Sequence, residues 1–153
     1  MEENSRKEVL EEIINNIDAV ENIVLEINQN VTIPNPHNIY SYFLTGHCNI
    51  YSLILLGVFE GYATPYDNNE HIVTKIGDNY YDVEGLANWK VEDSNYRETY
   101  KDYLLDPVFT GLGEYKEGVD DKVILEGIKV GRTLLEKKIK ERLEKRGEIS
   151  INQ

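Results

Sequence analysis

Residues 45–59, Thr-Gly-His-Cys-Asn-Ile-Tyr-Ser-Leu-Ile-Leu-Leu-Gly-Val-Phe, constrain the fold more than any other part of the chain. After Ser52 this stretch has little polar character on any side. A helix that is apolar all round belongs inside a core and not on a surface. The sequence therefore predicts a central buried helix, with the hydroxyl of Thr45 as its N-terminal cap.

The only cysteine of the chain, Cys48, falls in the first turn of this predicted helix. Unpaired backbone N–H groups and the positive end of the helix dipole favour a thiolate there. A rigid helix with a thiol at its positive end is a common way to build a sulfur nucleophile. The competing interpretation is structural, because a free cysteine is often a small buried hydrophobic residue.

Apolar residues at helical spacing predict further helices on both sides of this core. Near the N-terminus, Ser5 and Glu8 fit a capping box before one long helix, or before two helices that break near residues 15–18. A short helix is expected over residues 39–43, and Asp120-Asp121 are expected to cap the last helix. The expected buried stripe of the last helix consists of Ile124, Ile128, Leu135, Ile139 and Leu143.

A β-hairpin is predicted between residues 71 and 84. Residues 71–76 are rich in β-branched side chains, Gly77-Asp78 fits a two-residue turn, and residues 79–84 form the return strand. In this register His71 and Asp82 lie on one face as diagonal neighbours, with β-carbons about 7 Å apart. A slip of one residue would separate them. The opposite, core-facing side is expected to carry Ile72, Ile76, Tyr81 and Val83.

Weaker signals complete the expected architecture. Short strands are expected near residues 89–91 and 108–110, and Asp93-Ser94 are expected to cap another helix. One side of that helix would carry Tyr96, Tyr100, Tyr103 and Leu104. Together the elements predict an α+β fold with a single domain over residues 1–147 and a frayed tail at residues 148–153.

Cys48, His71 and Asp82 supply a thiol, an imidazole and a carboxylate, the three groups that a thiol enzyme needs as nucleophile, base and orienting acid. Residues 45–85, with Gly-His-Cys at a helix start and a later histidine before Gly-Asp-Asn-Tyr-Tyr-Asp, resemble the small papain-like and transglutaminase-like thiol enzymes of bacteria and phages. The resemblance implies a papain-like fold, in which a central Cys-bearing helix packs on a small antiparallel sheet between long N- and C-terminal helices. It implies Cys48 as nucleophile, His71 as base and Asp82 as the orienting group.

The sequence departs from these families in two respects. No glutamine precedes Cys48 to bind an oxyanion, so Asn38, His47 or the backbone N–H of Cys48 is expected to serve. The tryptophan found near these elements in transglutaminase-like enzymes is matched only loosely, by Trp89. The expected substrate is a protein or peptide amide, namely a peptide bond, an isopeptide bond or a glutamine side chain. Hydrolysis, deamidation and acyl transfer remain open.

Composition excludes other classes of function. The chain of 153 residues has a net charge of -12, which argues against direct binding of nucleic acid through its phosphates. A single cysteine excludes an internal disulfide, and neither a signal peptide nor a membrane-spanning run is recognisable. A cytoplasmic location without a membrane partner is therefore expected. The spacing of His37, His47, Cys48 and His71 matches no zinc-site pattern, so neither a metal nor another cofactor is expected.

A second hypothesis comes from a different class of protein. A small acidic protein of a phage or mobile element can inhibit a host protein by presenting carboxylates to its basic groove, without catalysis. A third hypothesis joins the two, since a papain-like scaffold that has lost catalysis can keep its binding cleft. The sequence does not decide between them, and it leaves the oligomeric state open.

Overall fold

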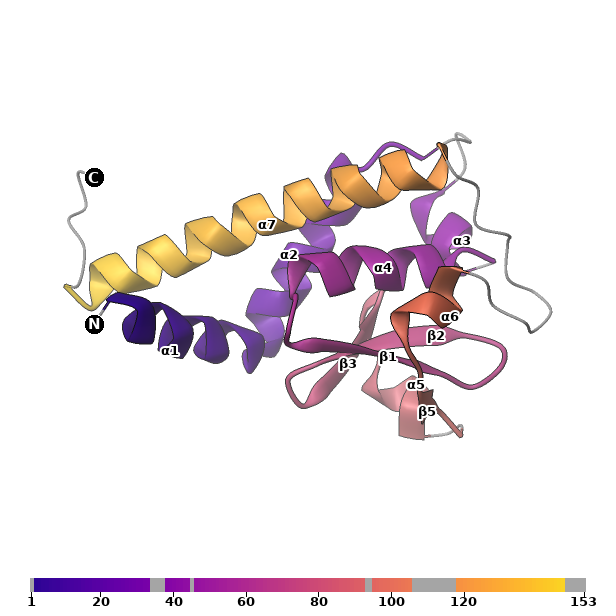
Figure 1. The fold of residues 1–153 in the computed structure, drawn as a ribbon, viewed down its shortest axis with the longest axis horizontal. Coiled ribbons are helices and arrows are strands. Elements are labelled where there is room, and N and C mark those ends of the chain that lie inside the picture. Colours follow the sequence, from indigo (N-terminus) through magenta and orange to yellow (C-terminus); the bar gives the residue numbers. More distant parts are fainter. Residues whose placement is uncertain (1, 34–37, 45, 93–94, 106–117, 148–153) are drawn as a thin grey trace.

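A computed structural model describes residues 2–33, 38–44, 46–92, 95–105 and 118–147 (Figure 1). It confirms the predicted α+β class, because helices combine with a five-stranded antiparallel sheet. In chain order the elements are α1 (Glu2–Ile14), α2 (Ile17–Asn30), α3 (Ile39–Leu44), α4 (Cys48–Val58), β1 (Ala63–Asp67), β2 (Ile72–Ile76), β3 (Asn79–Asp82), β4 (Gly85–Leu86), α5 (Asn88–Glu92), β5 (Arg97–Glu98), α6 (Lys101–Leu105) and α7 (Asp120–Lys145).

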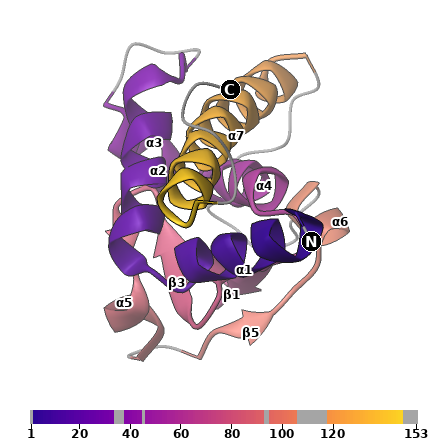
Figure 2. The same ribbon diagram turned by 90° about the vertical axis from the view of Figure 1, so that its left-hand side faces the viewer.

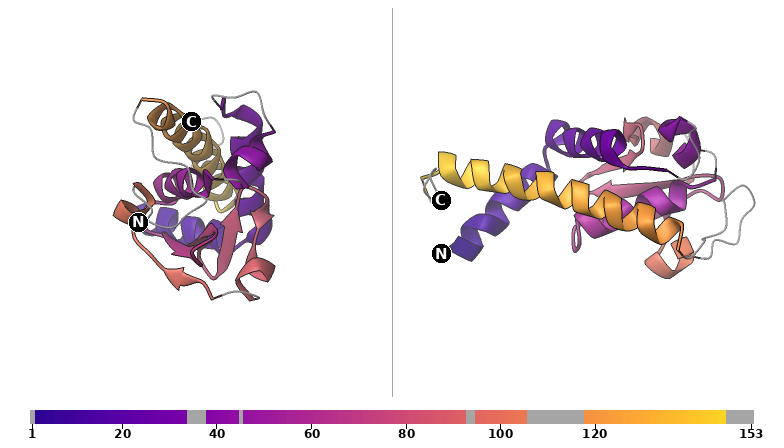
Figure 3. Two further views of the ribbon diagram at one scale, coloured as in Figure 1. Left: turned by 90° about the vertical axis from the view of Figure 1, so that its right-hand side faces the viewer. Right: turned by 90° about the horizontal axis from the view of Figure 1, so that it is seen from above.

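The helix α4 lies between the sheet and α7 (Figure 1). It contacts β1, β2 and β3 on one side and α7 on the other. The strands follow the order β4-β3-β2-β1-β5. Figure 2 shows α2 alongside this stack, where it contacts both α7 and β4. The C-terminal part of α7 extends past the sheet to α1 (Figure 3), where Arg146 and Glu8 form an ion pair at 2.9 Å.

The predicted central helix is confirmed, and its apolar composition explains its position. Every residue from Cys48 to Leu55 is buried, including Asn49 and Ser52. The hydroxyl of Ser52 is satisfied inside the core by Thr74 of β2, at 2.7 Å. The predicted cap, Thr45, lies outside the described residues. The N-cap position is held by His47, whose side chain makes no capping hydrogen bond.

The two-helix interpretation of the N-terminal segment is confirmed. α1 ends before Asn16, whose side-chain oxygen accepts the backbone N–H of Ala19 at 3.0 Å and so caps α2. The capping box at Ser5 and Glu8 is wrong, because α1 begins at Glu2 and both residues lie inside it. The short helix expected over residues 39–43 is confirmed as α3.

The predicted hairpin has the expected register, but the return strand β3 ends at Asp82 and not at residue 84, because the chain turns there and pairs with β4. Ile76 pairs with Asn79, and Thr74 pairs with Tyr81. Gly77 adopts a φ of 63°, which suits glycine as the first turn residue. The predicted core face is also confirmed, since none of its residues is more than 1% exposed; these are Ile72, Ile76, Tyr81 and Val83.

Two weaker predictions are wrong. The strand expected at residues 89–91 is the helix α5, because Asn88 anchors it to β3: its side chain accepts the backbone N–H of Tyr80 at 2.7 Å and donates to Asn79 at 2.9 Å. The helix expected from Tyr96 onward begins only at Lys101, because residues 97–98 pair with β1 as β5. The expected cap at residues 93–94, the strand at 108–110 and the tail at 148–153 lie outside the described residues.

The predicted face of α7 is right in its second half and wrong in its first. Leu135, Ile139 and Leu143 are buried, whereas Ile124 and Ile128 are only partly buried. The inward positions near the start of α7 belong to Val123, Gly127 and Gly131. The two glycines let α4 come close, because a β-carbon on Gly127 would lie 2.8 Å from Ile54 and one on Gly131 would lie 2.5 Å from Val58.

The cap of α7 also differs from the prediction. Val119 holds the N-cap position, so Asp120 and Asp121 are the first helical residues, where their charges complement the helix dipole. Among the described residues, no helix combines the length and the apolar character that a bilayer crossing requires.

Candidate functional site

The thiol of Cys48 lies at the start of α4 and is deeply buried, with only 3% of the residue exposed. Burial raises the pKa of the thiol to about 11, and the nearby charge of Asp82 adds to this rise. The backbone N–H groups of Ile72, Cys48 and Asn49 lower the pKa, but they do not outweigh burial. The thiol is therefore protonated at neutral pH, which corrects the expectation that the helix start yields a thiolate.

The predicted meeting of His71 and Asp82 is confirmed as a contact. The Nε2 atom of His71 lies 2.9 Å from Oδ2 of Asp82, and the side chains are 16% and 4% exposed. The other carboxylate oxygen of Asp82 accepts the backbone N–H of Glu84 at 2.9 Å. Burial raises the pKa of Asp82, but the bonds from His71 and Lys90 outweigh it and hold that pKa below its usual value. Asp82 is therefore an ionised, buried carboxylate.

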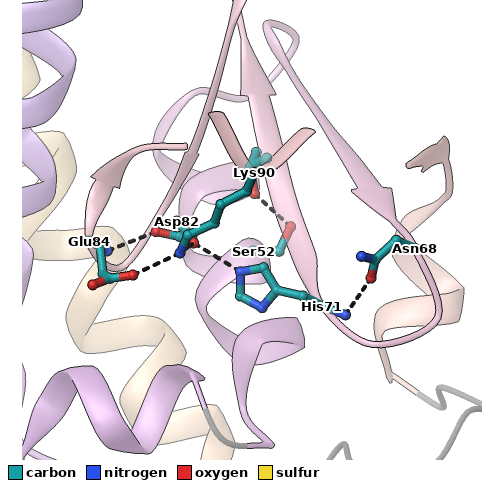
Figure 4. A network of polar contacts seen from close by, with 7 residues as sticks. Ser52, Asn68, His71, Asp82, Glu84 and Lys90 are labelled. Atoms are coloured by element: carbon teal, nitrogen blue, oxygen red, sulfur yellow. Dashed lines mark hydrogen bonds and ion pairs between the residues drawn. The ribbon is translucent and has the colours of Figure 1, made fainter. Parts of the chain in front are cut away.

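A lysine that sequence analysis missed completes this cluster. The Nζ atom of Lys90 lies 2.5 Å from Oδ2 of Asp82 and 2.8 Å from Oε1 of Glu84 (Figure 4). Burial lowers the pKa of Lys90, but these carboxylates outweigh it and raise that pKa above its usual value. The contact between Lys90 and Asp82 was not predicted because residues 89–91 were expected to form a strand. In the structure they belong to α5, and the side chain of Lys90 points back toward β3.

The backbone of His71 is held just before β2 by a short turn. Its N–H donates to Oδ1 of Asn68 at 2.7 Å, on the far side of the residue from Asp82 (Figure 4). The Nδ1 atom of the ring has no hydrogen-bond partner within the described part of the chain.

The sulfur of Cys48 lies beside the backbone that follows His71, and it makes no contact with the imidazole ring that a described hydrogen bond records. The backbone N–H of Ile72, the residue that follows His71, lies close enough to the sulfur to lower its pKa, and Cys48 and Ile72 line one small cavity. No hydrogen bond joins the sulfur to the His71 ring among the residues that the structure describes. The structure thus brings His71 and Asp82 into contact and places Cys48 beside the same strand start, without a direct thiol–imidazole bond.

The two side chains proposed for an oxyanion site are engaged locally. Asn38 is exposed, and its side chain accepts the backbone N–H of Tyr40 at 2.8 Å. The ring of His47 stacks on Tyr42 with centroids 4.0 Å apart, and its Nδ1 lies 3.2 Å from the carbonyl oxygen of that residue. Of the three candidates, the backbone N–H of Cys48 is the one that lies at the sulfur itself.

The sequence model of one protein family, described as Phage YunG-like protein, matches residues 14–110, which is more than half of the chain. The chain belongs to the Phage YunG-like protein family. The matched part of this YunG-like chain includes Cys48, His71, Asp82 and Lys90, and it ends before α7. No curated protein and no solved structure matches the chain. The family description names no reaction, and nothing in these comparisons connects the YunG-like chain with papain-like enzymes.

A groove opens beside His71 in this YunG-like protein. It has a volume of about 460 Å³ and is lined by Leu44, Glu70, His71, Glu84, Trp89, Lys90 and Tyr96. Trp89 is 63% exposed. Burial raises the pKa of Tyr96 to about 12, and the nearby carboxylates of Asp82 and Glu70 add to this rise. A larger groove of about 900 Å³ between α4 and α7 holds none of the predicted site residues.

Proposed function

We propose that this protein is a cysteine hydrolase or acyltransferase of papain-like fold that acts on an amide bond. Cys48 is the nucleophile, His71 the base, and Asp82 the group that orients the imidazole. The observation that carries the proposal is the 2.9 Å hydrogen bond between Nε2 of His71 and the buried carboxylate of Asp82, at the strand start that Cys48 touches. With Nε2 held in this way, Nδ1 is the nitrogen that accepts the thiol proton.

The reaction proceeds in two steps. The sulfur of Cys48 attacks the amide carbonyl as its proton passes to Nδ1 of His71, and the backbone N–H of Cys48 holds the oxyanion. The C–N bond then breaks, the leaving amine takes the proton from His71, and a thioester remains on Cys48. Water, deprotonated by His71, attacks the thioester, releases the acid and restores the thiol. An amine in place of water gives acyl transfer.

The buried thiol determines how the first step takes place. Because its pKa is about 11, the sulfur does not rest as a thiolate paired with an imidazolium. It attacks only as His71 removes its proton, which requires the sulfur to approach Nδ1. Catalytic hydrogen bonds are often long or absent before substrate binds and tighten in the complex. Entry of substrate into the groove beside His71 would bring about that approach.

The proposal is tested by trapping the acyl-enzyme. The protein is mixed with p-nitrophenyl acetate, p-nitrophenolate release is followed by absorbance, and the modified residue is located by mass spectrometry. We expect a burst of about one equivalent per chain with the acetyl group on Cys48, and no burst from Cys48→Ala. The protein unfolded in urea provides the reactivity of an ordinary thiol as control. Acetylation of surface lysines alone, or an unchanged burst from Cys48→Ala, would refute the proposal.

A second candidate function is a binding module that uses the same groove without turnover. The protonated, buried thiol favours it, because such a cysteine fills space as a small hydrophobic residue. The Cys48→Ala variant separates the two candidates. A binding module would keep its biological activity with alanine at this position, whereas the enzyme would lose it.

Trp89 is expected to bind the acyl part of the substrate. Its indole is 63% exposed in the groove beside His71, and the Nζ of Lys90 lies 5.4 Å from its ring centroid. With p-nitrophenyl hydrocinnamate as an apolar probe, Trp89→Ala should raise KM about 3- to 10-fold with little change in kcat. Tyr100→Ala provides the matched control, because Tyr100 is 65% exposed and does not line this groove. Equal effects of both substitutions would contradict a role for Trp89 in binding.

A further inference from the structure

The carboxylate of Asp82 is shared between an imidazole and a lysine. Its Oδ2 atom lies 2.9 Å from Nε2 of His71 and 2.5 Å from Nζ of Lys90. All three side chains have little exposure, at 4% for Asp82, 16% for His71 and 14% for Lys90. Charges at such distances and with such burial interact far more strongly than charges on an open surface.

An ionised aspartate beside an imidazole has two separable effects. Its hydrogen bond fixes the orientation and the tautomer of the ring. Its charge also stabilises the imidazolium, which makes the ring hold a proton to higher pH. A general base at neutral pH benefits from the first effect and is impaired by the second, because a protonated ring accepts nothing from a thiol.

We infer that Lys90 is a positioning residue that neutralises Asp82, so that Asp82 orients the His71 ring without drawing a proton onto it. That Lys90 assists His71 as a general base rests on the proposed function. The electrostatic effect of Lys90 on His71 is measurable by itself. The ion pair between Lys90 and Asp82 acts on the ring as a nearly neutral hydrogen-bond acceptor would.

The other charged groups around His71 do not replace Lys90. Glu84 and Glu70 line the same groove, but Glu84 is 49% exposed and Glu70 is exposed, so water screens both. The phenol of Tyr96 and the thiol of Cys48 are both protonated at neutral pH, since their pKa values are raised to about 12 and about 11. Within the described ranges of the chain, Lys90 is therefore the lysine or arginine that balances Asp82 at the ring.

The test is a proton titration of His71 followed by NMR on protein labelled at histidine carbon. In Lys90→Met, we expect the midpoint of the His71 titration to move to higher pH by about one to two pH units. The direction follows because loss of the cation leaves the carboxylate of Asp82 uncompensated, and this stabilises the protonated ring. Lys90→Arg should restore the wild-type midpoint, because it restores the charge.

Two further variants keep the inference falsifiable. Lys75→Met removes a lysine from β2 whose Nζ lies over Tyr80, at 5.8 Å from the ring centroid, and it should leave the His71 midpoint unchanged. Lys90→Gln removes the charge but keeps a hydrogen-bond donor, so it serves if the methionine variant does not fold. An unchanged or lower midpoint in folded Lys90→Met or Lys90→Gln would overturn the inference. The proposed function is tested by a different experiment, the acylation by p-nitrophenyl acetate, and it fails if no acetyl group is found on Cys48.

Discussion

His71→Ala is expected to slow the acylation of Cys48 by p-nitrophenyl acetate by about 10²- to 10⁴-fold at neutral pH. The reason lies in the buried thiol. With a pKa of about 11, only about one thiol in 10⁴ is ionised at pH 7. Without an imidazole to remove the proton during attack, only this small fraction reacts. A thiol that rested as a thiolate would depend far less on its base.

The pH dependence of the same reaction distinguishes loss of a base from loss of structure. Acylation of the wild-type protein should depend less steeply on pH, because His71 removes the thiol proton during the attack. In His71→Ala, the rate should rise about tenfold per pH unit, because it follows the thiolate fraction, and should level off only near pH 11. Stopped-flow absorbance across this range gives both curves, and circular dichroism confirms that the variant is folded.

A matched pair of aspartate variants completes this experiment. Asp82→Asn removes the carboxylate that orients the His71 ring and should lower the acylation rate. Asp67 of β1 is buried to a similar degree, with 6% exposure, and its carboxylate accepts the backbone N–H of Asn69 at 3.2 Å. Asp67→Asn should keep the wild-type rate. Equal rates for wild type, His71→Ala and Asp82→Asn would show that Cys48 reacts without either group.

The central helix and the hairpin were predictable because each is fixed by local chemistry. An apolar stretch such as residues 50–58 has no stable place except a core, and the structure buries it between the sheet and α7. The hairpin register follows from Gly77-Asp78, and the period of two residues then determines which side chains meet. The contact between His71 and Asp82 is a direct consequence of that register.

The features that could not be predicted, namely α5, β5 and the state of the Cys48 thiol, depend on contacts between segments that are distant in the sequence. Residues 89–91 have the composition of a strand, but Asn88 bonds to β3 and the chain turns into α5, which brings Lys90 to Asp82. Strand β5 has only two residues and exists because β1 has a free edge there. The state of the Cys48 thiol was mispredicted because its position in the helix is local information, whereas its burial among Phe43, Ile72 and Val83 is not.

Gly131→Ala is expected to lower the free energy of unfolding by about 2–3 kcal/mol. At an exposed helix position, glycine to alanine stabilises a protein by about 1 kcal/mol. The destabilisation expected at Gly131 is therefore the opposite of what helix propensity alone would give. A β-carbon on Gly131 would lie 2.5 Å from Val58 of α4 and 3.1 Å from Ile27 of α2, which forces α7 away from both helices. Urea denaturation measures the change, and Thr133→Ala, at an exposed position of the same helix, should leave stability unchanged or slightly raised.

A double-mutant cycle identifies the clash as the cause. Val58→Ala alone removes buried methyl groups and destabilises the protein, but it also opens the space that the new β-carbon needs. The double variant should therefore be more stable than the sum of the two single effects predicts.

The Gly131→Ala variant also tests the predicted single domain, because α4 lies within the family-matched residues and α7 lies beyond them. If residues 1–147 fold as one unit, circular dichroism and Trp89 fluorescence shift together in Gly131→Ala. Loss of helix signal without a shift at Trp89 would mean that α7 detaches from a core that is stable by itself.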